Sequence, residues 1–489
     1  MDLAVADPQL SLVAGRTAPR ETERSELLAR RIVYAATAAY ALVFSAAAAV
    51  TYAAYEEPRF DLGNMVQAVW ASSNGHLLRM TTERGVEISR LGAHVDPFLV
   101  LLVPFWWAWS SPLVLLIVQA IAVASGAIPV YWLARKHLQS GRLAAFFSVA
   151  YLLYPATQFN AFTPIGMHPV SFAIPLILFA IWYLDEDRLV PFCVFAAVAV
   201  TTKEEIGAAI GCLGVWYCVR RGKRSVGLAI AGAGFAITFF NMLVVIPHFA
   251  ESGASPFAGR YSDVGTTPSG MLHTAVSDPA AFLQAVGTWH KLAFVAVLLV
   301  PFLGLWRFEP LMLLGAAPDL ALDLLSSKPE QSTIFYHYTA GIVPFVVAAS
   351  VLGAARRKGN PARITHWVFA VVCCLAVISP LWAAASNVDR ARSSNPVHAA
   401  TRRALDLVPP HASVSASQSL GAYLSARRNI SVFPNVKRAE WVAVGKLRDG
   451  EDNPEAFRAT LMKLRHNPSW RVVFDSNGIT VLERRAGAQ

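Results

Sequence analysis

Charged residues are scarce in this sequence. Of its 489 residues 15% are charged and 55% are hydrophobic, with a mean hydropathy of +0.44, whereas about a quarter of a soluble domain is charged. A soluble chain this apolar would aggregate, so the composition excludes an ordinary soluble protein. The five cysteines all lie in apolar segments, which argues against a disulfide framework or a thiolate metal site. His-x-x-x-His and His-Glu-x-x-His spacings are absent, as is any internal repeat.

The apolar residues are gathered in long blocks, such as Ile32 to Ala54, Pro112 to Ala134, Val226 to Pro247 and Trp367 to Ala385. Each block is about long enough to cross roughly 30 Å of hydrocarbon as a helix. A signal peptide is the alternative for the first block, because Ala46 to Ala54 is rich in small residues. The polar stretch before this block and its length favour a spanning helix.

The positions of Lys and Arg in short loops predict the orientation, because positive loops stay on the cytoplasmic side. Arg16 to Arg31 places the N-terminus inside. Five later loops should then be cytoplasmic, and all but the second carry net positive charge: Arg135 to Arg142, Asp185 to Arg188, Arg220 to Arg224, Arg307, and Arg356 to Arg363.

About eleven spanning helices fit this pattern, several of them short enough to need tilt or local thinning of the bilayer. The fold class expected is therefore an α-helical polytopic membrane protein with a small extracytoplasmic α/β domain. We divide the chain into a cytoplasmic tail (1–30), a transmembrane domain (31–388) with a first outer loop (55–111), and the extracytoplasmic domain (389–489). The spans expected are 31–54, 112–134, 143–158, 169–184, 189–202, 206–219, 225–248, 292–306, 310–326, 339–355 and 366–387.

Two segments outside these spans have structure of their own. Pro97 to Trp109 is predicted to lie in the membrane interface, where tryptophan is favoured; as a span it would move two arginine-rich loops outside. The tail is predicted to form strands and helices, with Ser476-Asn477-Gly478 as a hairpin turn. The strands expected are 413–416, 430–433, 441–445, 471–474 and 479–482, and the helices 420–427 and 454–466, the second capped by Asn453.

The tail is basic. From Asp389 onward 16 Lys and Arg face 9 Asp and Glu, a net charge of +7. Such a surface beside a membrane favours anionic lipids or glycans as neighbours, although solubility alone explains it equally well. We expect membrane lipids as partners and no nucleic acid.

The predicted topology sorts the polar residues at the ends of the spans by side. The outer side collects aspartates, histidines and basic residues from segments far apart in the chain. This set consists of Asp61, Asn64, His94, Asp96, His168, Lys203, Glu204, Glu205, Arg260, Asp319, Asp323, Tyr336, His337 and Tyr338.

Several of these residues have a plain structural interpretation. Lys203-Glu204-Glu205 is as well explained by a hydrophilic turn between two short helices. A lone histidine near a helix end is more often a hydrogen-bonded structural residue than a ligand. Asp319 and Asp323 are harder to dismiss, because they lie one helical turn apart in an apolar span. Metal binding by His94, Asp96 and a further carboxylate stays open, so a divalent metal is possible, but no spacing signature supports it.

Asp61 is the strongest single candidate. It follows the first span among aromatic and apolar residues, where its pKa can be tuned and where it can meet a substrate from the lipid. Its alternative role is the N-cap of a helix over Leu62 to Ala71, and the two roles are compatible.

The motif Phe60-Asp61-Leu62-Gly63-Asn64 and the motif Gly92 to Pro97 resemble the bacterial membrane family of domain-of-unknown-function 2079. Further similarity runs through Pro164 to Pro175, Lys203-Glu204-Glu205 and Tyr336-His337-Tyr338. That family resembles the GT-C glycosyltransferases, which take a sugar from a polyprenyl-phosphate carrier and place an acidic residue in the first outer loop. The resemblance implies a bacterial plasma membrane protein that transfers a sugar to an extracytoplasmic glycan, lipid or protein.

Asp61 matches the acidic position of GT-C enzymes, but Leu62 follows it where many members carry a second acid. Three roles for Asp61 therefore stay open. It can act as the base alone, it can act together with Asp96 as a second carboxylate, or it can have no part as a base. An inverting displacement needs a base for the acceptor hydroxyl and cations for the departing phosphate. We assign Lys203, His94 and Arg260 to the phosphate, and His168, Glu204, Glu205, Asp319, Tyr336 and His337 to the phosphate or the sugar.

Two other function classes stay open. A transporter or flippase of an anionic lipid or lipid-linked sugar would favour charges at the bilayer midplane and paired repeats with broken helices. In this sequence the charges lie at the outer ends of the spans and no repeat is present. A non-catalytic scaffold of the cell envelope is the third class.

Overall fold

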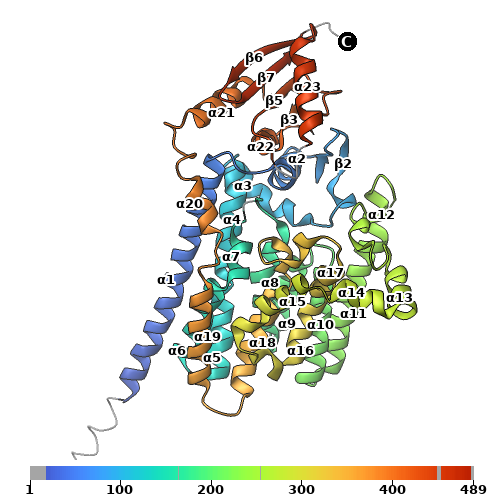
Figure 1. Ribbon diagram of the computed structural model, residues 1–489. Helices are drawn as coiled ribbons and strands as arrows, with labels where there is room; N and C mark the ends of the chain where they lie inside the picture. The colour runs from blue at the N-terminus through green and yellow to red at the C-terminus, as the bar shows by residue number, and fades with distance from the viewer. Residues whose placement is uncertain (1–17, 164, 254, 449–452, 486–489) are drawn as a thin grey trace, which may run out of the picture.

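A helical bundle carries a small α/β domain on one end in the computed structural model, which describes residues 18–163, 165–253, 255–448 and 453–485 (Figure 1). Residues 1–17 of the predicted cytoplasmic tail lie outside the described residues. Helix α1 (Ala18–Ala53) runs along the whole side of the bundle and ends beneath the α/β domain. The end of the bundle that carries this domain is called the domain end below, and the other end the opposite end.

Most helices of the bundle are shorter than a bilayer is thick. Within the described residues, three helices are long and apolar enough to cross a membrane, or four if the bent pair Pro279–Val286 and Trp289–Phe302 forms one span. The three are Glu23–Ala53, Pro112–Leu138 and Arg224–Phe249, and seven further apolar helices have 10–17 residues. The predicted number of eleven spans therefore stays a prediction.

The helices of the bundle have local causes in the sequence. Proline occupies the first turn of many of them, where its missing N–H is not needed, and Ser111, Ser140, Thr288 and Asn360 cap their helices with a side-chain oxygen. The bundle comprises α1, α4 (Pro112–Ser125), α5 (Ala127–Leu138), α6 (Gly141–Leu153), α7 (Pro155–Ala161), α8 (Ala173–Asp185), α9 (Leu189–Ala199), α10 (Ile206–Arg220), α11 (Arg224–Phe240), α12 (Ile246–Phe249), α13 (Pro268–Ser277), α14 (Pro279–Val286), α15 (Trp289–Leu299), α16 (Pro310–Leu313), α17 (Ala317–Leu325), α18 (Val343–Arg356), α19 (Pro361–Leu375) and α20 (Leu381–Asn387).

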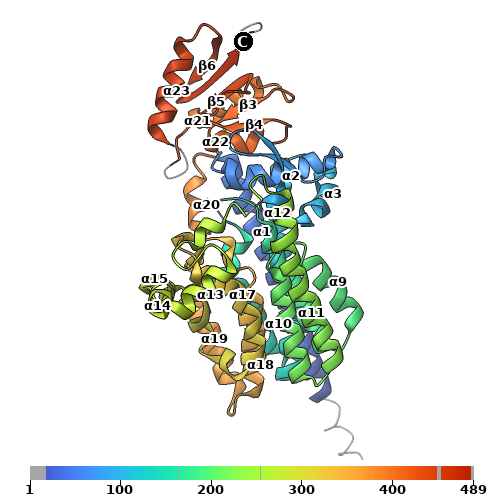
Figure 2. The same cartoon turned by 90° about the vertical axis from the view of Figure 1, so that its right-hand side faces the viewer.

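Several predicted spans are broken helices. Residues 143–158 divide into α6 and α7 at Pro155, which cannot donate to the preceding turn. Residues 310–326 divide into α16, a 3-10 turn and α17. Residues 366–387 divide into α19 and α20. Figure 2 shows that the long α10 and α11 run side by side along the other flank of the bundle.

Glycines allow this close pairing of α10 and α11. A Cβ at Gly214 would lie 2.5 Å from the backbone N of Ala231, and one at Gly234 would lie 2.5 Å from the backbone of α10. Small residues let helix backbones approach closely, which suits helix packing in a membrane.

Ion pairs join the basic loops at the opposite end. Asp185 lies 2.7 Å from Lys136 Nζ and 2.8 Å from His137 Nε2. Glu309, fully buried, pairs with Arg220 at 3.1 Å and with Arg356, and accepts a hydrogen bond from Trp216 Nε1 at 2.9 Å. The loop at 185–188 carries acidic residues and therefore has no net positive charge. These carboxylates form ion pairs with basic residues of the neighbouring loops. The five loops predicted to share one side therefore meet at one end.

The first long loop, between α1 and α4, folds at the domain end. It contains a short π-helical turn, η1 (Arg59–Gly63), helix α2 (Asn64–Ser73), the hairpin of β1 (Arg79–Thr81) and β2 (Glu87–Ser89), and a 3-10 turn leading into α3 (Val103–Ala108). The sequence predicted the apolar helical segment near 97–109 but missed the hairpin. The two strands are short and mostly polar, which leaves no periodic signal.

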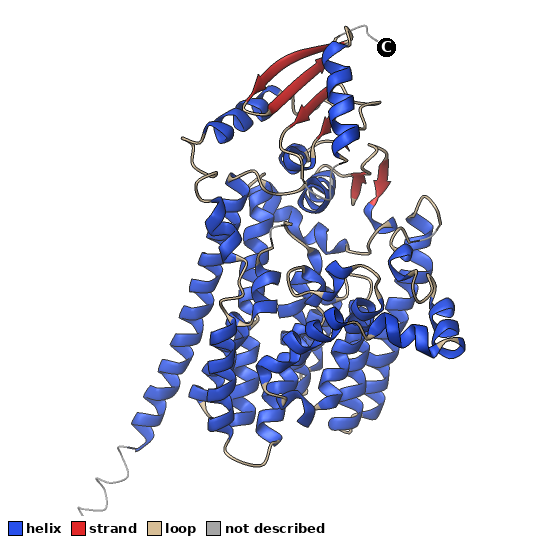
Figure 3. Ribbon diagram, in the orientation of Figure 1, coloured by secondary structure: helices blue, strands red, loops and turns tan. Residues whose placement is uncertain are grey.

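The C-terminal domain is a five-stranded sheet of order β4-β3-β5-β7-β6 with helices on both faces (Figure 3). All five strands lie at predicted positions, Asn477 and Gly478 have the positive φ of the predicted hairpin turn, and Asn453 caps α23. The first helix α21 was missed, and the helix predicted over 420–427 begins and ends earlier. The elements are α21 (Pro396–Leu407), β3 (Val414–Ala416), α22 (Gln418–Gly421), β4 (Ile430–Val432), β5 (Trp441–Val444), α23 (Pro454–His466), β6 (Trp470–Ser476) and β7 (Ile479–Arg484).

The core of this domain lies on the inner strands. Val414, Ile430, Val442 and Val481 are buried beneath α21 or α23. On the edge strand β6, Val472 is 41% exposed, whereas Val473 and Phe474 are half-buried and pack against this core.

Candidate active site at the domain end

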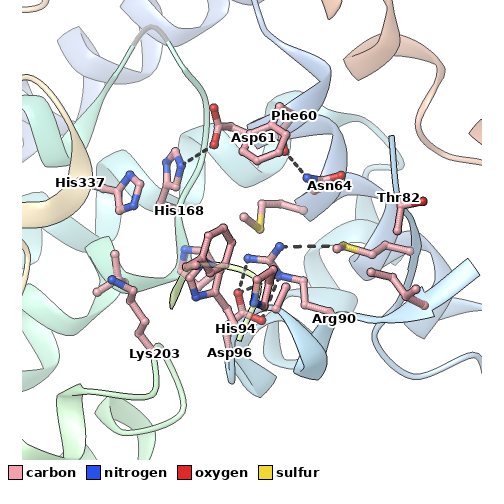
Figure 4. Close-up of a pocket in the computed structure, with 18 of the residues that line it drawn as sticks. Phe60, Asp61, Asn64, Thr82, Arg90, His94, Asp96, His168, Lys203 and His337 are labelled. Atoms are coloured by element: carbon pink, nitrogen blue, oxygen red, sulfur yellow. Dashed lines mark hydrogen bonds and ion pairs between the residues drawn. The ribbon is translucent and has the colours of Figure 1, made fainter. Parts of the chain in front are cut away.

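A cavity of about 260 Å³ lies at the domain end, between the first loop, the ends of several bundle helices and the C-terminal domain. Figure 4 shows Asp61, His168, His337, Lys203, His94 and Asp96 around it. These residues come from segments far apart in the sequence, as the predicted topology requires. Polar and charged residues that line the cavity are Arg59, Asp61, Asn64, Thr81, Thr82, Glu83, Arg90, His94, Asp96, His168, Thr202, Lys203, Arg260, His337 and Tyr338.

Asp61 lies in the π-helical turn η1, a rare conformation that is frequent at functional sites. Its Oδ1 lies 3.3 Å from His168 Nε2, and its side chain is 21% exposed. The alternative role as an N-cap is wrong, because α2 begins at Asn64 after Gly63 and no side chain caps it. Asp61 is therefore partly exposed to the cavity and held by one histidine.

The C-terminal domain holds the turn that carries Asp61. The backbone N–H of Phe60 donates to Gln418 Oε1 at 3.0 Å. A Cβ at Gly421 would lie 2.5 Å from Arg59 Cβ, so only glycine permits α22 to approach η1 this closely. The C-terminal domain thus fixes the position of Asp61 although it is more than 350 residues away in sequence.

Arg59 supports the same turn from inside the protein. Its guanidinium is buried and donates to Asn64 Oδ1, to Gln67 Oε1 at 3.0 Å and to the Thr81 carbonyl at 3.3 Å. Burial lowers the pKa of Arg59 to about 10, so the guanidinium stays charged at neutral pH. Hydrogen bonds from its two Nη groups, rather than an ion pair, compensate for its burial, while its Nε has no partner among the described residues.

His168 connects Asp61 to a second histidine. The His168 and His337 rings stack with centroids 3.7 Å apart and 15° between their planes. Burial and the neighbouring basic groups His168, Lys203, His94 and Arg260 hold the pKa of His337 well below its usual value. His337 is therefore neutral at physiological pH, and its ring packs flat against the ring of His168.

The Asp96 carboxylate forms an ion pair with Arg90. Arg90 Nε lies 3.1 Å and 2.9 Å from its two carboxylate oxygens, and Nη2 lies 2.6 Å from Oδ2. Both side chains are almost fully buried. Both carboxylate oxygens of Asp96 thus already accept hydrogen bonds from Arg90, which leaves them poorly placed to contact an acceptor hydroxyl. The geometry therefore favours Asp61 over Asp96 as the base and gives Asp96 a positioning role.

Glu204 and Glu205 each hold a basic neighbour. Glu204 accepts from His94 Nδ1 at 2.9 Å and from the Val95 N–H at 3.0 Å, and Glu205 pairs with Lys203. Burial raises the pKa of Glu204, but His94 and Lys203 outweigh it and lower this pKa to about 2. The Lys-Glu-Glu segment is thus a turn between the two short helices α9 and α10, as the sequence suggested, and its side chains form a buried ion-pair network with His94 beside the cavity.

Arg260 differs from the other cations of the site. Its guanidinium lies 4.1 Å from the centre of the Phe257 ring. Within the described ranges of the chain, it makes no ion pair and no side-chain hydrogen bond. Its donors are available to a ligand, which makes Arg260 the best anion-binding group of the set.

A second cavity of about 250 Å³ adjoins the first. The two share His94, Lys203, Phe257, Arg260 and Tyr338 as a common wall. Residues that line only the second cavity include Glu204, Glu205, Tyr261, Asp319, Asp323 and Gln331. The predicted site is therefore two adjoining chambers, called the Asp61 cavity and the acidic cavity below.

The structure gives no support to two further predictions, that of Tyr336 as a substrate contact and that of a metal site. Tyr336 lines neither cavity and packs its ring edge-on against Tyr338, with centroids 6.4 Å apart. Over the described residues, no group of three or more histidine, cysteine, aspartate or glutamate residues could hold a metal ion. His94 pairs with Glu204, whereas Asp96 pairs with Arg90, so the two do not share a partner.

Glu57 is a residue that the sequence argument missed. It is fully buried close to Asp61 and Arg448, and both of its carboxylate oxygens lack a hydrogen-bond partner among the described residues. Its backbone N–H donates to the Tyr423 hydroxyl of the C-terminal domain at 3.2 Å. Burial raises the pKa of Glu57 to about 8, with Arg448 lowering it and Asp61 and Glu56 raising it. Segments far away in the sequence, including the C-terminal domain and the loop at Gly166, pack around this residue, so no local pattern marks it.

The raised pKa of Glu57 predicts how stability depends on pH. Between its usual value of 4.5 and about 8, the folded protein holds a proton that the unfolded chain has released. Stability from this group is therefore complete below pH 4.5 and is lost as the pH rises toward 8, by about 1.4 kcal/mol per unit. We expect Glu57→Gln, which is neutral at every pH, to remove this slope. The measurement is the melting temperature of both proteins in detergent from pH 5 to 8.

The other titrating groups are the same in both proteins, so the difference between the two melting curves isolates Glu57. A difference that stays constant from pH 5 to 8 would show that Glu57 is ionised in the folded protein throughout this range.

Comparison with known proteins agrees with this architecture. The family model described as "Predicted membrane protein (DUF2079)" matches residues 57–481. No curated protein matches. ArnT from Cupriavidus metallidurans in the apo state aligns with a TM-score of 0.52 at 13% identity, over 93% of this chain and all of that chain. ArnT bound to undecaprenyl phosphate aligns with a TM-score of 0.50 at 11% identity, over 91% and 98%. An oligosaccharyltransferase from Archaeoglobus fulgidus aligns with a TM-score of 0.44 at 12% identity, over 82% and 68%.

The family match covers most of the chain: the bundle apart from α1, both cavities and nearly all of the C-terminal domain. The alignments with ArnT extend over nearly the whole of both chains and show the fold. The chain therefore belongs to the DUF2079 family of predicted membrane proteins and has the fold of ArnT from Cupriavidus metallidurans.

Proposed function

We propose that this protein is a membrane glycosyltransferase that takes a sugar from a polyprenyl-phosphate carrier and transfers it to an acceptor outside the cytoplasm. One observation carries the proposal: a single cavity joins a partly exposed carboxylate, Asp61, to cations that include the available guanidinium of Arg260. A base and an anion site facing one space are what glycosyl transfer from a phosphate needs. The GT-C fold, seen in ArnT bound to undecaprenyl phosphate, supports the choice of a lipid-linked donor.

In the proposed reaction Asp61 accepts the proton of the acceptor hydroxyl. The oxygen forms a bond to the anomeric carbon, and the bond from that carbon to the phosphate oxygen breaks. The electron pair leaves with the phosphate, so polyprenyl phosphate is the second product. His168 orients the Asp61 carboxylate through its Nε2 atom.

The leaving phosphate needs fixed positive charge. Arg260 and Lys203 line the cavity and supply it, His94 lies beside them as a further phosphate contact, and burial strengthens the attraction because little water screens it. Burial lowers the pKa of Lys203, but Glu205, Glu204 and Asp319 outweigh it and hold this pKa above its usual value. Lys203 therefore stays charged in the absence of substrate.

The proposed sidedness rests on the loops at the opposite end. Their basic residues mark this end as cytoplasmic by the positive-inside rule, so the domain end with both cavities faces outward from a bacterial plasma membrane. The basic C-terminal domain then lies outside the cytoplasm. It covers the Asp61 cavity and is placed to bind an acceptor glycan, lipid or protein.

The test is an assay of the purified wild-type protein in proteoliposomes. The donors are undecaprenyl phosphates esterified with radiolabelled hexoses or pentoses, and the acceptors are a cell-envelope fraction from a strain that lacks the protein. We expect label to enter an envelope component with equal release of undecaprenyl phosphate. Movement of the intact donor across the bilayer without release would identify a flippase, and binding with neither result would identify a scaffold.

A further inference from the structure

The acidic cavity contains two carboxyl groups, each with one oxygen that no group among the described residues satisfies. Asp319 is 5% exposed and Asp323 is 3% exposed, and both line the cavity from α17. Oδ1 of Asp319 and Oδ2 of Asp323 lack a hydrogen-bond partner among the described residues. A buried acceptor without a donor is costly, so these oxygens are expected to meet donors from a ligand.

The backbone around Asp319 is shaped to hold its carboxylate in place. A Cβ at Gly341 would lie 1.9 Å from Asp319 Oδ2, so any other residue at 341 would displace the carboxylate. The two aspartates are four residues apart and project from the same face of α17. Their free oxygens thus form a fixed pair of acceptors on one wall.

The remaining wall of the cavity excludes several kinds of ligand. Glu204 and Glu205 add two more carboxylates and would repel a phosphate placed deep in the cavity. No metal cluster is found over the described residues. Aromatic rings of Phe257, Tyr261 and Tyr338 provide flat apolar surface beside the carboxylates. Acceptors next to aromatic faces suit a ring that carries several hydroxyl donors.

The position of the common wall fixes how such a ring would lie. Arg260, Lys203 and His94 face both cavities, and the sugar of the proposed donor is bonded directly to its phosphate. A phosphate at this wall therefore places the anomeric carbon at the boundary and leaves the rest of the sugar to enter one chamber. The Asp61 cavity must stay open for the acceptor.

We infer that the acidic cavity is the sugar-binding subsite, in which Asp319 and Asp323 accept hydrogen bonds from hydroxyl groups of the donor sugar. The inference rests on the proposed function and adds to it the place of the sugar. Arg260 and the common wall bind the phosphate, and the Asp61 cavity admits the acceptor.

The test compares the affinity of the purified protein for bare undecaprenyl phosphate and for its hexosyl and pentosyl esters. The loss of two hydrogen bonds is enough to change affinity by about tenfold. We expect Asp319→Asn with Asp323→Asn to weaken binding of the preferred sugar ester by at least about tenfold and to leave binding of the bare lipid unchanged. Unchanged binding of the bare lipid also shows that the variant is folded. The exposed Asp263→Asn, on the loop beside the cavity, is the matched control and should change neither affinity.

Three outcomes would overturn the inference. If no sugar ester binds the wild type more tightly than the bare lipid, the cavity does not bind the sugar. Equal loss of both affinities in the double variant would place the phosphate beside the aspartates, and no loss of either would make the two carboxylates dispensable. A wild-type protein that binds neither lipid would refute the proposed function itself, which separates the two failures.

Discussion

Asp61→Asn is expected to lower the rate of sugar transfer by about 10² to 10⁴ while the protein keeps its stability and its affinity for the lipid carrier. Asparagine keeps the size of aspartate and the contact with His168 but is not a base, and a general base contributes about this factor to a rate. The measurement is the initial rate of undecaprenyl phosphate release by wild type and variant in proteoliposomes, together with the melting temperature of each.

The hydrogen bonds around η1 make this substitution a clean one. Arg59 and the Phe60 N–H, which hold the turn, bond to Asn64, Gln67 and Gln418 and not to the Asp61 side chain. The turn should therefore survive the change. Wild-type turnover by Asp61→Asn would show that Asp61 is not the base, and loss of turnover in a folded Asp96→Asn variant would move that role to Asp96.

Arg90→Ala is expected to destabilise the protein by about 3–5 kcal/mol, because it leaves the buried Asp96 carboxylate without a partner. The double change Arg90→Met with Asp96→Leu removes both charges and should recover most of that loss, since an apolar pair of similar volume avoids the cost of burying charge. Denaturant titration of the detergent-solubilised proteins measures both effects. If Asp96 carried catalysis rather than structure, Arg90→Ala would retain stability and the double variant would lose only activity.

These two experiments distinguish carboxylates that look alike in the sequence. Asp61 and Asp96 both follow an aromatic or aliphatic residue in the first loop and both line the same cavity. Asp96 is buried and accepts three short hydrogen bonds from one arginine. Asp61 is partly exposed and has one contact to a histidine. The difference between the two comes entirely from the neighbours that folding supplies.

Local patterns predicted the parts of the fold that depend on local forces. The strands of the tail follow from short β-rich runs, and the Asn453 cap and the Asn477-Gly478 turn follow from backbone requirements of single residues. The hairpin of β1 and β2 and the helix α21 were missed. The hairpin strands have three residues each, and the buried face of α21 consists of the small residues Ala400, Thr401 and Ala404, so neither segment contains a run of large apolar residues.

The sequence by itself determined that this is a membrane protein of the DUF2079 family, because long apolar runs and family motifs are properties of the chain alone. It also allowed the prediction that most of the site residues lie on the same side, because the positive loops indicate which ends of the helices face the cytoplasm. Only the tertiary structure decided which groups pair: Arg90 with Asp96, His94 with Glu204, and His168 with Asp61. It alone buried Glu57 under the C-terminal domain and placed Asp323 in a second cavity. Such pairings depend on which segments pack together, and the energy of a charge depends on its burial and its neighbours rather than on its place in the chain.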